Sequence, residues 1–498
     1  MEDQRHFVVL LCVGLYMGIC VLVGIWSLRR TKSTHDFFMA GRDLGILVTA
    51  MAVFSSTMSG FGFVGGPGLV YRMGLSSVWM IGCSSIGFAL VYYLMGKRIR
   101  LLAELTNSIS LPDVVANRYG NESSRFLVAV AILLGVIAYL ASQIKAMAMV
   151  LQGILSQSAF LGSLSLEWCV AISCAVLVFY CVTGGIIASV YTDLFQGIVM
   201  IVASLLVFIT AMTAVEGGFT EMTRTLSADD PETLSPWGTL GIFGCLSWYF
   251  LFVLGSSGQP HIVTKLMMNK RVSDVRYVMP ITLLGLAFSA LLWVGIGLCM
   301  RTLVIKGVHP ELSHADAAAP QFLQTYAHPL LSGIVFAGLF AAIMSTADGF
   351  LNIGTAAIIH DIPRAIKGRS LPHELVWARL VTVFLAIAAA LFSLYSGVDL
   401  IALLGAFGWG TFAAALVPVV AIGLNWKRAT PLAANAAITV SLVINFTLLV
   451  LKKGGFQLPY RIEGGAVALL VSLTVFFGIS LLSKPKKIAP EIEAIMDF

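Results

Sequence analysis

Apolar residues dominate the chain in a series of long runs, each of about 20 residues and separated by short polar segments. A run of that length forms an α-helix that can cross the ~30 Å hydrocarbon core of a bilayer. Such runs are centred near residues 17, 55, 85, 140, 173, 200, 247, 289, 344, 386, 411, 440 and 473. The pattern therefore predicts an all-α membrane protein with about 13 transmembrane helices and no soluble domain.

The composition agrees with this pattern. Of the 498 residues, 58% are hydrophobic and 11% are charged, and the mean hydropathy is +0.92, which is far from the balance of a soluble domain. The eight cysteines lie in or beside apolar runs without metal-ligand spacing, so we interpret them as small hydrophobic residues. The net charge of +6 is spread over short loops without a continuous basic stripe, which argues against a nucleic-acid partner.

Basic residues are distributed unevenly among the loops. If the N-terminus lies outside, most of the 31 Lys and Arg fall in cytoplasmic loops, Lys265 and Lys270 among them, as the positive-inside rule requires. Lys452 and Lys453 are the clear exception. The run from Phe7 to Leu28 is too long for a signal peptide and should remain as a helix. We expect a multi-pass protein of the plasma membrane, the inner membrane of a bacterium, with its N-terminus outside and its C-terminus cytoplasmic.

Two of the apolar runs are interrupted by glycine, proline and clustered hydroxyl residues. One reads VFSSTMSGFGFVGGPG, near residue 55, and the other ends in LGSSGQPHI, near residue 255. Such interruptions free backbone groups that lipid cannot satisfy, so they persist where the helix lines a cavity or another helix. Glycine and proline are also common in membrane helices in general. The clustered hydroxyl groups favour a binding site.

The two interrupted runs occupy comparable places in two halves of opposite orientation, 44–215 and 237–424. Interrupted helices at matching places in inverted halves are the best pointer in a sequence to a transporter's midplane site. We expect 1–43 to form an extra N-terminal helix and inner loop, and 216–236 an acidic outer loop. Residues 425–498 are expected to form C-terminal helices and a short cytoplasmic tail. No obligate protein partner is indicated.

Hydroxyl and carboxyl groups also lie inside the apolar run near residue 344, in the segment AAIMSTAD. On a helix, Ala342, Ser345, Asp348 and Asn352 share one face, and Thr346 lies beside it. An acid at the centre of a bilayer is costly and by default functional. Oxygen ligands suit a hard cation such as sodium. The alternative is a set of small and polar residues that joins neighbouring helices.

Two further charged residues fall within apolar runs. Asp193 lies near the inner end of the run that contains TGGIIASVYTDLFQG. We interpret it either as an interfacial carboxylate or as part of a cation route. Lys145 lies in AYLASQIKAMAM, too far from either helix end for its side chain to reach the interface. It is expected to pair with an internal carboxylate such as Asp348 or to meet an anionic substrate. Tyr139 and Gln143 lie on or near the same face, as substrate contacts or as interhelical contacts.

Five segments, taken in order, resemble the sodium:solute symporter family over essentially the whole chain. They are DFFMAGRDLG (36–45), MSG with GGPGLVYRMGL (58–75), TGGIIASVYTDLFQG (183–197), GQPHI (258–262) and AAIMSTAD (341–348). The resemblance, nearest to bacterial proline and pantothenate symporters, implies a five-plus-five inverted repeat of the leucine-transporter type, with extra flanking helices and Na⁺ as the coupling ion.

The resemblance also implies roles for individual residues. Sodium would be bound by backbone carbonyls at Ser55, Met58 and Ala342 and by the hydroxyls of Ser345 and Thr346. Asp193 matches an aspartate linked to sodium coupling or release, and Asp348 stands where some members bind a second ion. The expected substrate contacts are Ser59, Tyr139, Gln143, Lys145, Phe252 and Ser256.

Several positions depart from the proline symporters. Thr57 replaces an aspartate, and Phe252 and Ser256 replace a tryptophan and a tyrosine, so proline itself is not implied. Lys145 and the GGPG segment instead favour a carboxylate-bearing solute, such as an organic acid, an amino acid or a vitamin like pantothenate.

Secondary active symport of sodium and a small organic solute is therefore the function we expect. A transporter-like sensor is the alternative, although the tail KPKKIAPEIEAIMDF is expected to carry no output domain. A channel is disfavoured by the paired interruptions. An enzyme is not expected, because no nucleophile and base constellation and no phosphate loop is present.

Overall fold

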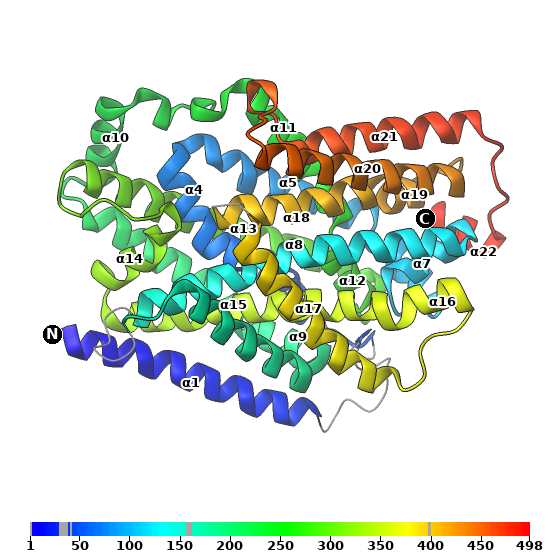
Figure 1. Ribbon diagram of the computed structural model, residues 1–498, viewed down its shortest axis with the longest axis horizontal. Helices are drawn as coiled ribbons and strands as arrows, with labels where there is room; N and C mark the ends of the chain where they lie inside the picture. Colours follow the sequence, from blue (N-terminus) through cyan, green and yellow to red (C-terminus); the bar gives the residue numbers. More distant parts are fainter. Residues whose placement is uncertain (1, 29–37, 40–41, 156–161, 397–399) are drawn as a thin grey trace.

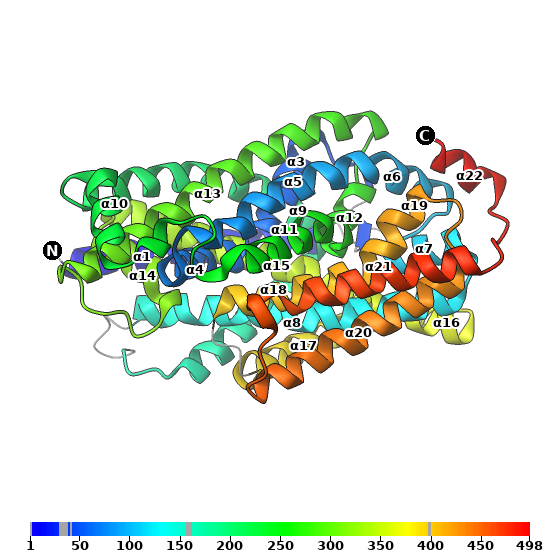
Figure 2. The same ribbon diagram turned by 90° about the horizontal axis from the view of Figure 1, so that it is seen from above.

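The structure is a computed structural model that describes residues 2–28, 38–39, 42–155, 162–396 and 400–498. Within these ranges all the regular elements are helices, and the only β-type pairing is an isolated bridge between Leu44 and Asn269. The long helices run roughly side by side along the longest dimension of the molecule (Figures 1 and 2). The all-α class predicted from the apolar runs is confirmed.

The longer helices form the body of the bundle, and shorter ones connect them. The longer helices are α1 (Glu2–Leu28), α3 (Ile46–Thr57), α5 (Val78–Leu94), α8 (Glu122–Leu155), α9 (Leu166–Ala214), α11 (Gly241–Gly255), α13 (Val275–Ile305), α15 (Pro329–Ala356), α17 (Glu374–Tyr395), α18 (Ile401–Leu416), α20 (Pro431–Lys453) and α21 (Gly464–Leu482). The shorter ones include α4 (Gly66–Met73), α6 (Gly96–Leu105), α7 (Leu111–Tyr119), α10 (Gly218–Asp229), α12 (Pro260–Met267), α14 (Ala318–Thr325), α16 (Ile362–Lys367), α19 (Gly423–Asn425) and α22 (Pro490–Met496). Four 3-10 or π turns matter below: η2 (Phe61–Gly65), η6 (Ser256–Gly258), η8 (Ala315–Ala317) and η9 (Ala357–Asp361).

Ten helical stretches in the described residues are long and apolar enough to cross a membrane. Three shorter apolar helices, Arg5–Ile19, Ile46–Thr57 and Leu166–Phe179, coincide with the runs predicted near residues 17, 55 and 173. The runs near 173 and 200 both lie within α9, which continues for 49 residues. The number of thirteen crossings stays a prediction.

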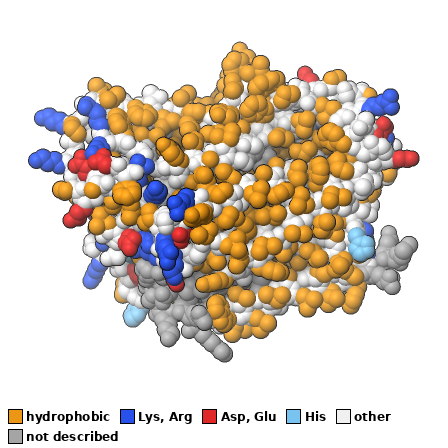
Figure 3. Space-filling model, turned by 180° about the vertical axis from the view of Figure 1, so that it is seen from behind, with side chains coloured by type: hydrophobic (Ala, Val, Ile, Leu, Met, Phe, Trp, Pro, Cys, Tyr) orange, Lys and Arg blue, Asp and Glu red, His pale blue; other side chains and the backbone are white. Residues whose placement is uncertain are grey.

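The surface of the bundle is that of a protein surrounded by lipid. Figure 3 shows a broad, almost continuous hydrophobic area across the middle of one side, with charged side chains gathered toward the two ends. Large apolar side chains exposed on the surface include Leu22, Phe384, Val443 and Leu470. Because a monomeric soluble protein rarely exposes so large an apolar area, this surface fits the hydrocarbon core of a bilayer.

The two ends of the bundle carry different short elements. One end, here called the N-face, carries the N-terminus, α10 and α14, and the opposite end, the C-face, carries α7, α16, α19 and α22 (Figure 1). Between them, α15 is the central helix and contacts α9, α1, α8 and α3, while α18 packs along α8. Nearly every side chain of α15 and α18 is buried. Polar groups on these helices are therefore withdrawn from both lipid and bulk water.

Candidate functional site

Both interruptions predicted from the sequence are present. α3 ends at Thr57, and the chain resumes as the π-helical turn η2 before α4. α11 ends at Gly255, and η6 with an extended Gln259 (φ −78°, ψ 108°) separates it from α12. Helices broken in this way expose main-chain N–H and C=O groups inside the bundle, where they can bind an ion or a solute.

The first interruption packs directly against α8 and α15. The N–H of Gly60 donates a hydrogen bond of 3.0 Å to Oε1 of Gln143 on α8. A Cβ atom at Gly60 would lie 2.6 Å from Cβ of Ala146 and 2.9 Å from Cγ1 of Ile343, so a larger residue would push the helices apart. The structure thus places Gln143, a predicted substrate residue, at the interruption itself.

The predicted sodium residues of α15 face the last turn of α3. The Thr346 hydroxyl lies 2.9 Å from the carbonyl oxygen of Ala342 and 3.3 Å from that of Ser56, and it donates to them. The Ser345 hydroxyl donates to Oδ1 of Asp193 on α9. The other predicted ligands, Ser55 and Met58, are buried in the same turn of α3. The structure therefore brings α3, α9 and α15 together at oxygen atoms suited to a hard cation.

A buried lysine also belongs to this group, and its predicted place in a cytoplasmic loop was wrong. Lys265 lies on α12 with its side chain only 2% exposed. Its Nζ donates to Oδ2 of Asp193 at 2.9 Å, to the carbonyl of Ala52 at 2.8 Å and to the hydroxyl of Ser56. The sequence held one signal: Pro260 is typical of the first turn of a new helix, which carries Lys265 onward inside the bundle.

Asp193 and Lys265 form a buried ion pair, with Asp193 fully buried. Such a pair depends on additional hydrogen bonds, because each charge loses its hydration. Here Ser345, Ser56 and the Ala52 carbonyl supply them. The ammonium group is thus linked through Asp193 to Ser345, one of the predicted sodium ligands, and the oxygens around it can hold a monovalent cation.

Asp348 lies on the α9 side of α15 and is buried. Its carboxyl group faces Cys181 and Ser189, and the charged groups that act on it are Asp193 and Lys265. The structure therefore places Asp348 beside the buried ion pair, in agreement with the predicted second cation position or release path, which stays a prediction.

Lys145 acts on a different carboxylate from the one proposed as its partner. Its charge influences Asp316 of η8, which is fully buried and accepts a 2.8 Å hydrogen bond from the N–H of Ile401. Burial raises the pKa of Asp316 to about 7, although the Ile401 hydrogen bond and the charges of Lys145 and Arg72 oppose that rise. Asp316 is a buried acid near the N-face that the sequence analysis did not select.

Several polar atoms around the two interruptions are buried without a hydrogen-bond partner in the described part of the chain. They include the hydroxyl groups of Ser59 and Tyr139, both ring nitrogens of His261 and the indole N–H of Trp293. Ser59 and Tyr139 approach each other closely, but their geometry does not satisfy a hydrogen bond. Buried polar atoms are nearly always paired, so such a concentration needs an explanation, and a polar ligand supplies one.

Aromatic rings enclose these polar atoms. Tyr139 packs against Phe350, with ring centroids 4.6 Å apart, and Phe350 against His261 at 4.4 Å. Phe61 lies 6.4 Å from Tyr139 and 5.8 Å from Trp293. Neither His261 nor Trp293 was among the residues predicted from the sequence to contact the substrate.

The two remaining predicted substrate residues lie on another side of the second interruption. Phe252 packs against Trp409, with ring centroids 5.4 Å apart, and the Ser256 hydroxyl donates to the Phe252 carbonyl at 2.8 Å. Trp409 is a further buried side chain with an unpartnered N–H among the described residues.

A small cavity extends from this region toward the C-face. Its volume of about 20 Å³ is enough for a water molecule or a small ion. It is lined by Ser110 and Pro112 of the α7 region, by His261 and Lys265 of α12 and by Asn352 of α15. His261 and Lys265 therefore connect the polar region at the interruptions with α7 on the C-face.

Comparisons with known proteins find relatives over most of the chain. The family model described as "Sodium:solute symporter family" matches residues 37–440. The chain is 29% identical over 442 residues to the osmoregulated proline transporter OpuE of Bacillus subtilis (strain 168), covering 87% of each chain. It is 28% identical over 424 residues to a sodium/proline symporter of Staphylococcus aureus (strain JH9), covering 84% of this chain and 81% of that protein.

Solved structures show the same fold. A Na⁺-coupled sialic acid symporter in a substrate-bound outward-open state has a TM-score of 0.75 at 18% identity, covering 97% of this chain and 99% of that one. MHP1, a nucleobase-cation-symport-1 family transporter in a closed conformation, has a TM-score of 0.57 at 14% identity, covering 93% and 98%.

Proposed function

The chain belongs to the sodium:solute symporter family and carries out sodium-coupled solute symport, and we propose that its solute is a small molecule bearing a carboxylate. Relatives are named for proline, and a structural neighbour is named for sialic acid. Both of these solutes carry a carboxylate. An amino acid or a small organic acid is therefore the expected cargo, and proline is the first compound to test.

The observation that carries the proposal is the group of unpartnered polar atoms between the two interrupted helices. A solute with hydrogen-bonding groups would satisfy Ser59, Tyr139, His261 and Trp293, while the surrounding rings would contact its apolar part. Sites for small molecules have this composition, with apolar walls and a few placed polar groups. Lys145, on the same helix as Tyr139 and Gln143, is the proposed contact for the carboxylate.

Sodium would bind where α3 and α15 meet, through Ser345, Thr346 and the carbonyls of Ser55, Met58 and Ala342. The ion would then compete with the ammonium group of Lys265 for Asp193, because Ser345 and Lys265 both donate to that carboxylate. Sodium binding would weaken the hold of Asp193 on Lys265 and so free α12, which carries His261. Ion and solute would each favour binding of the other by the same coupling free energy, typically ~1 to 3 kcal/mol.

The proposed topology has the N-face outside and the C-face in the cytoplasm of a bacterial cell, because the basic loops gather on the C-face side. The proposed internal symmetry relates 44–215 to 237–424. Cysteine-accessibility labelling at exposed positions such as Glu216 and Lys486 in intact cells tests the orientation. Labelling of the first position alone by a membrane-impermeant reagent is the expected result.

Thermal-shift screening of the purified protein tests the solute class. Carboxylates, amino acids, sugars and vitamins are added in sodium and, separately, in potassium, because a ligand that binds the folded state raises its stability. A carboxylate that shifts the midpoint only in sodium is the expected result. Uptake of the same radiolabelled compound into proteoliposomes should then require an inward sodium gradient.

The matched variant for the carboxylate contact is Lys145→Met. The variant should need a roughly tenfold higher solute concentration for the same thermal shift, because the loss of one charged contact costs ~1.4 kcal/mol. Sodium-dependent stabilisation should remain. Lys97→Met, at an exposed position of α6, is the control and should change neither. If only sugars without a carboxylate shift the midpoint, the proposed solute class is wrong.

The alternative of a transporter-like sensor is not supported by the relatives, which are transporters. A protein that only senses its ligand would show the thermal shift without accumulation in proteoliposomes.

A further inference from the structure

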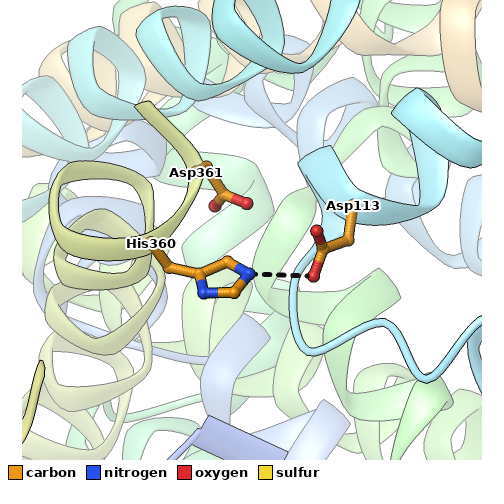
Figure 4. A group of neighbouring side chains, drawn as sticks. All are labelled: Asp113, His360 and Asp361. Atoms are coloured by element: carbon orange, nitrogen blue, oxygen red, sulfur yellow. Dashed lines mark hydrogen bonds and ion pairs between the residues drawn. The ribbon is translucent and has the colours of Figure 1, made fainter. Parts of the chain in front are cut away.

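A second cluster of buried titratable groups lies at the C-face, away from the interruptions. Ser110 caps the N-terminus of α7, where its hydroxyl accepts a 3.1 Å hydrogen bond from the N–H of Asp113. The π-helical turn η9 at the end of α15 presents His360 and Asp361 toward Asp113 (Figure 4). All three of these side chains are buried, with Asp361 only 1% exposed.

The imidazole ring of His360 is held from both sides. Its Nδ1 lies 3.3 Å from Oε1 of Glu374, and its Nε2 lies 3.2 Å from Oδ2 of Asp113. A carboxylate on the far nitrogen fixes the ring and increases its basicity, which is how proteins orient a histidine that binds a metal. The near nitrogen, Nε2, is thereby directed at the carboxylates of Asp113 and Asp361.

The Asp361 carboxylate supplies an independent observation. Its Oδ1 accepts a 2.6 Å hydrogen bond from the hydroxyl of Ser110, whereas its Oδ2 is buried and has no hydrogen-bond partner among the described residues. Figure 4 shows this carboxylate pointing into the space beside His360 and Asp113. A buried carboxylate oxygen normally accepts a hydrogen bond or binds a cation, so this oxygen is available to a cation.

The two neighbouring guanidinium groups approach Asp113 from the other side. Arg125 donates to Oδ1 of Asp113, and Nη1 of Arg364 lies 3.5 Å from that same atom. Oδ2 of Asp113 is left to His360 and to the N–H of Ile109 at 3.1 Å. The carboxylates of Asp113, Glu122, Asp361 and Glu374 outnumber these two guanidinium groups, so the cluster carries excess negative charge when His360 is neutral.

We propose that Asp113, His360 and Asp361 bind one divalent transition-metal ion of the Zn²⁺ type. One atom from each residue, Nε2 of His360 and a carboxylate oxygen of each aspartate, lies within 4.8 Å of the other two. Ligand atoms ~2.1 Å from one zinc ion are about 3.4 Å apart, so small side-chain rotations complete the site. A histidine nitrogen with two carboxylate oxygens suits Zn²⁺ or Mn²⁺ and disfavours sodium.

The location gives such an ion a consequence for transport. It would join α7 to the end of α15, and both elements line the cavity near the C-face through Ser110, Pro112 and Asn352. A bound ion would hold that side of the cavity in one arrangement and slow its opening. Metal binding itself does not depend on the proposed solute or on sodium coupling.

The experiment is a zinc titration of the purified full-length protein, freed of metal, in competition with a chromophoric chelator. Wild-type protein should bind one Zn²⁺ per chain at this site. His360→Gln and the isosteric Asp361→Asn should each weaken that binding roughly 100-fold or more, and Glu374→Gln roughly 10- to 100-fold. His309→Gln is the matched control, because His309 is buried to the same 8% and bonds only Tyr326 and Gln321 in the described structure.

The two ligand variants also guard against a failure to fold. The thermal midpoint of each variant is compared with that of wild type in the presence of chelator. A variant whose midpoint is unchanged is folded, and its zinc affinity then tests the site. Zinc binding that is lost in His360→Gln or Asp361→Asn and kept in His309→Gln supports the site. Equal zinc binding by all these proteins, or none by wild type, overturns it and leaves Arg125 and Arg364 as the cations of the cluster.

Discussion

Asp193 with Lys265 and Asp113 with Arg125 are both buried pairs of a carboxylate and a cation, yet their surroundings differ. Lys265 has an aspartate, a hydroxyl and a main-chain carbonyl as partners, in the region where α3 and α15 offer oxygen ligands. Arg125 bonds Glu122 as well as Asp113, in a cluster that joins α7, α8 and the end of α15. A sodium ion can replace one ammonium group, whereas it cannot replace a guanidinium that bridges two carboxylates.

From this difference we infer which buried charge takes part in transport and which supports the fold. Arg125 binds as a planar fork that fixes geometry, while Lys265 is a compact charge on a flexible chain. We therefore expect the first pair to exchange its cation during transport and the second to stay closed.

The largest expected effect comes from Lys265→Met. It leaves Asp193 buried without its cation, which lowers the free energy of unfolding by about 3 to 5 kcal/mol in potassium. Sodium should restore much of this loss, up to ~2.7 kcal/mol at a concentration 100 times its Kd, because the ion takes the vacated position. Thermal midpoints in sodium and in potassium measure both quantities.

The matched variant at the other pair is Arg125→Met. It should destabilise by up to a similar ~3 to 5 kcal/mol, because the buried Asp113 loses its nearest cation and keeps only His360 and the longer contact to Arg364. Sodium and potassium should give the same midpoint for this variant. A sodium-specific recovery of Arg125→Met would remove the distinction between the two pairs.

A smaller effect is expected at another buried acid, Asp316, near the N-face. Its folded-state pKa, raised to about 7, exceeds the value near 4 of an unfolded chain, so its protonated form favours folding. That contribution is complete below pH ~4 and is lost as the pH rises toward 7, by a few kcal/mol at most. Asp316→Asn keeps an acceptor for the Ile401 N–H and should flatten this decline between pH 4 and pH 7. Equal pH dependence in both proteins would show that Asp316 is not the titrating group.

Tyr139→Phe is expected to have the smallest effect on stability. Its hydroxyl has no hydrogen-bond partner in the described structure, so its loss should leave the free energy of unfolding nearly unchanged. KM for the solute should rise roughly 5- to 10-fold, as for one lost hydrogen bond of about 1 to 1.4 kcal/mol.

Tyr119→Phe gives the reverse pattern and serves as its control. The Tyr119 hydroxyl is buried and donates to the carbonyl of Val419 at 2.9 Å. Its removal should lower the free energy of unfolding by about 1 kcal/mol and leave KM unchanged. Solute uptake and thermal denaturation of the two variants, measured together, separate a substrate contact from a structural one.

Polar residues inside apolar runs made much of the central region predictable from the sequence. Hydroxyl groups at Ser345 and Thr346 and the glycine-rich interruptions are visible locally, because nothing in a lipid environment explains them without a partner. The apolar runs likewise predicted the helical bundle. The number of membrane crossings was less predictable, because the apolar runs near residues 173 and 200 form one continuous helix, α9.

The remaining features depend on contacts between distant parts of the chain. Lys265 was expected in a cytoplasmic loop because it follows the apolar run centred near residue 247, and only the packing of α12 against α3, with the contact to Asp193, shows it buried. Asp113 and His360 are 247 residues apart in sequence, and no local pattern relates them. Sequence periodicity places residues on a face, but the partner across the interface is set by tertiary packing.

The most direct test of the proposed sodium site is sodium-driven uptake by the variant that carries both Ser345→Ala and Thr346→Ala. A control variant with Ser204→Ala and Thr302→Ala removes two buried hydroxyls that bond only the preceding turn of their own helices. In proteoliposomes with the solute found by thermal shift, an inward sodium gradient should accelerate uptake by wild type and control. The gradient should no longer accelerate uptake by the Ser345 and Thr346 variant. Sodium-driven uptake at the wild-type rate in that variant would contradict the proposed site.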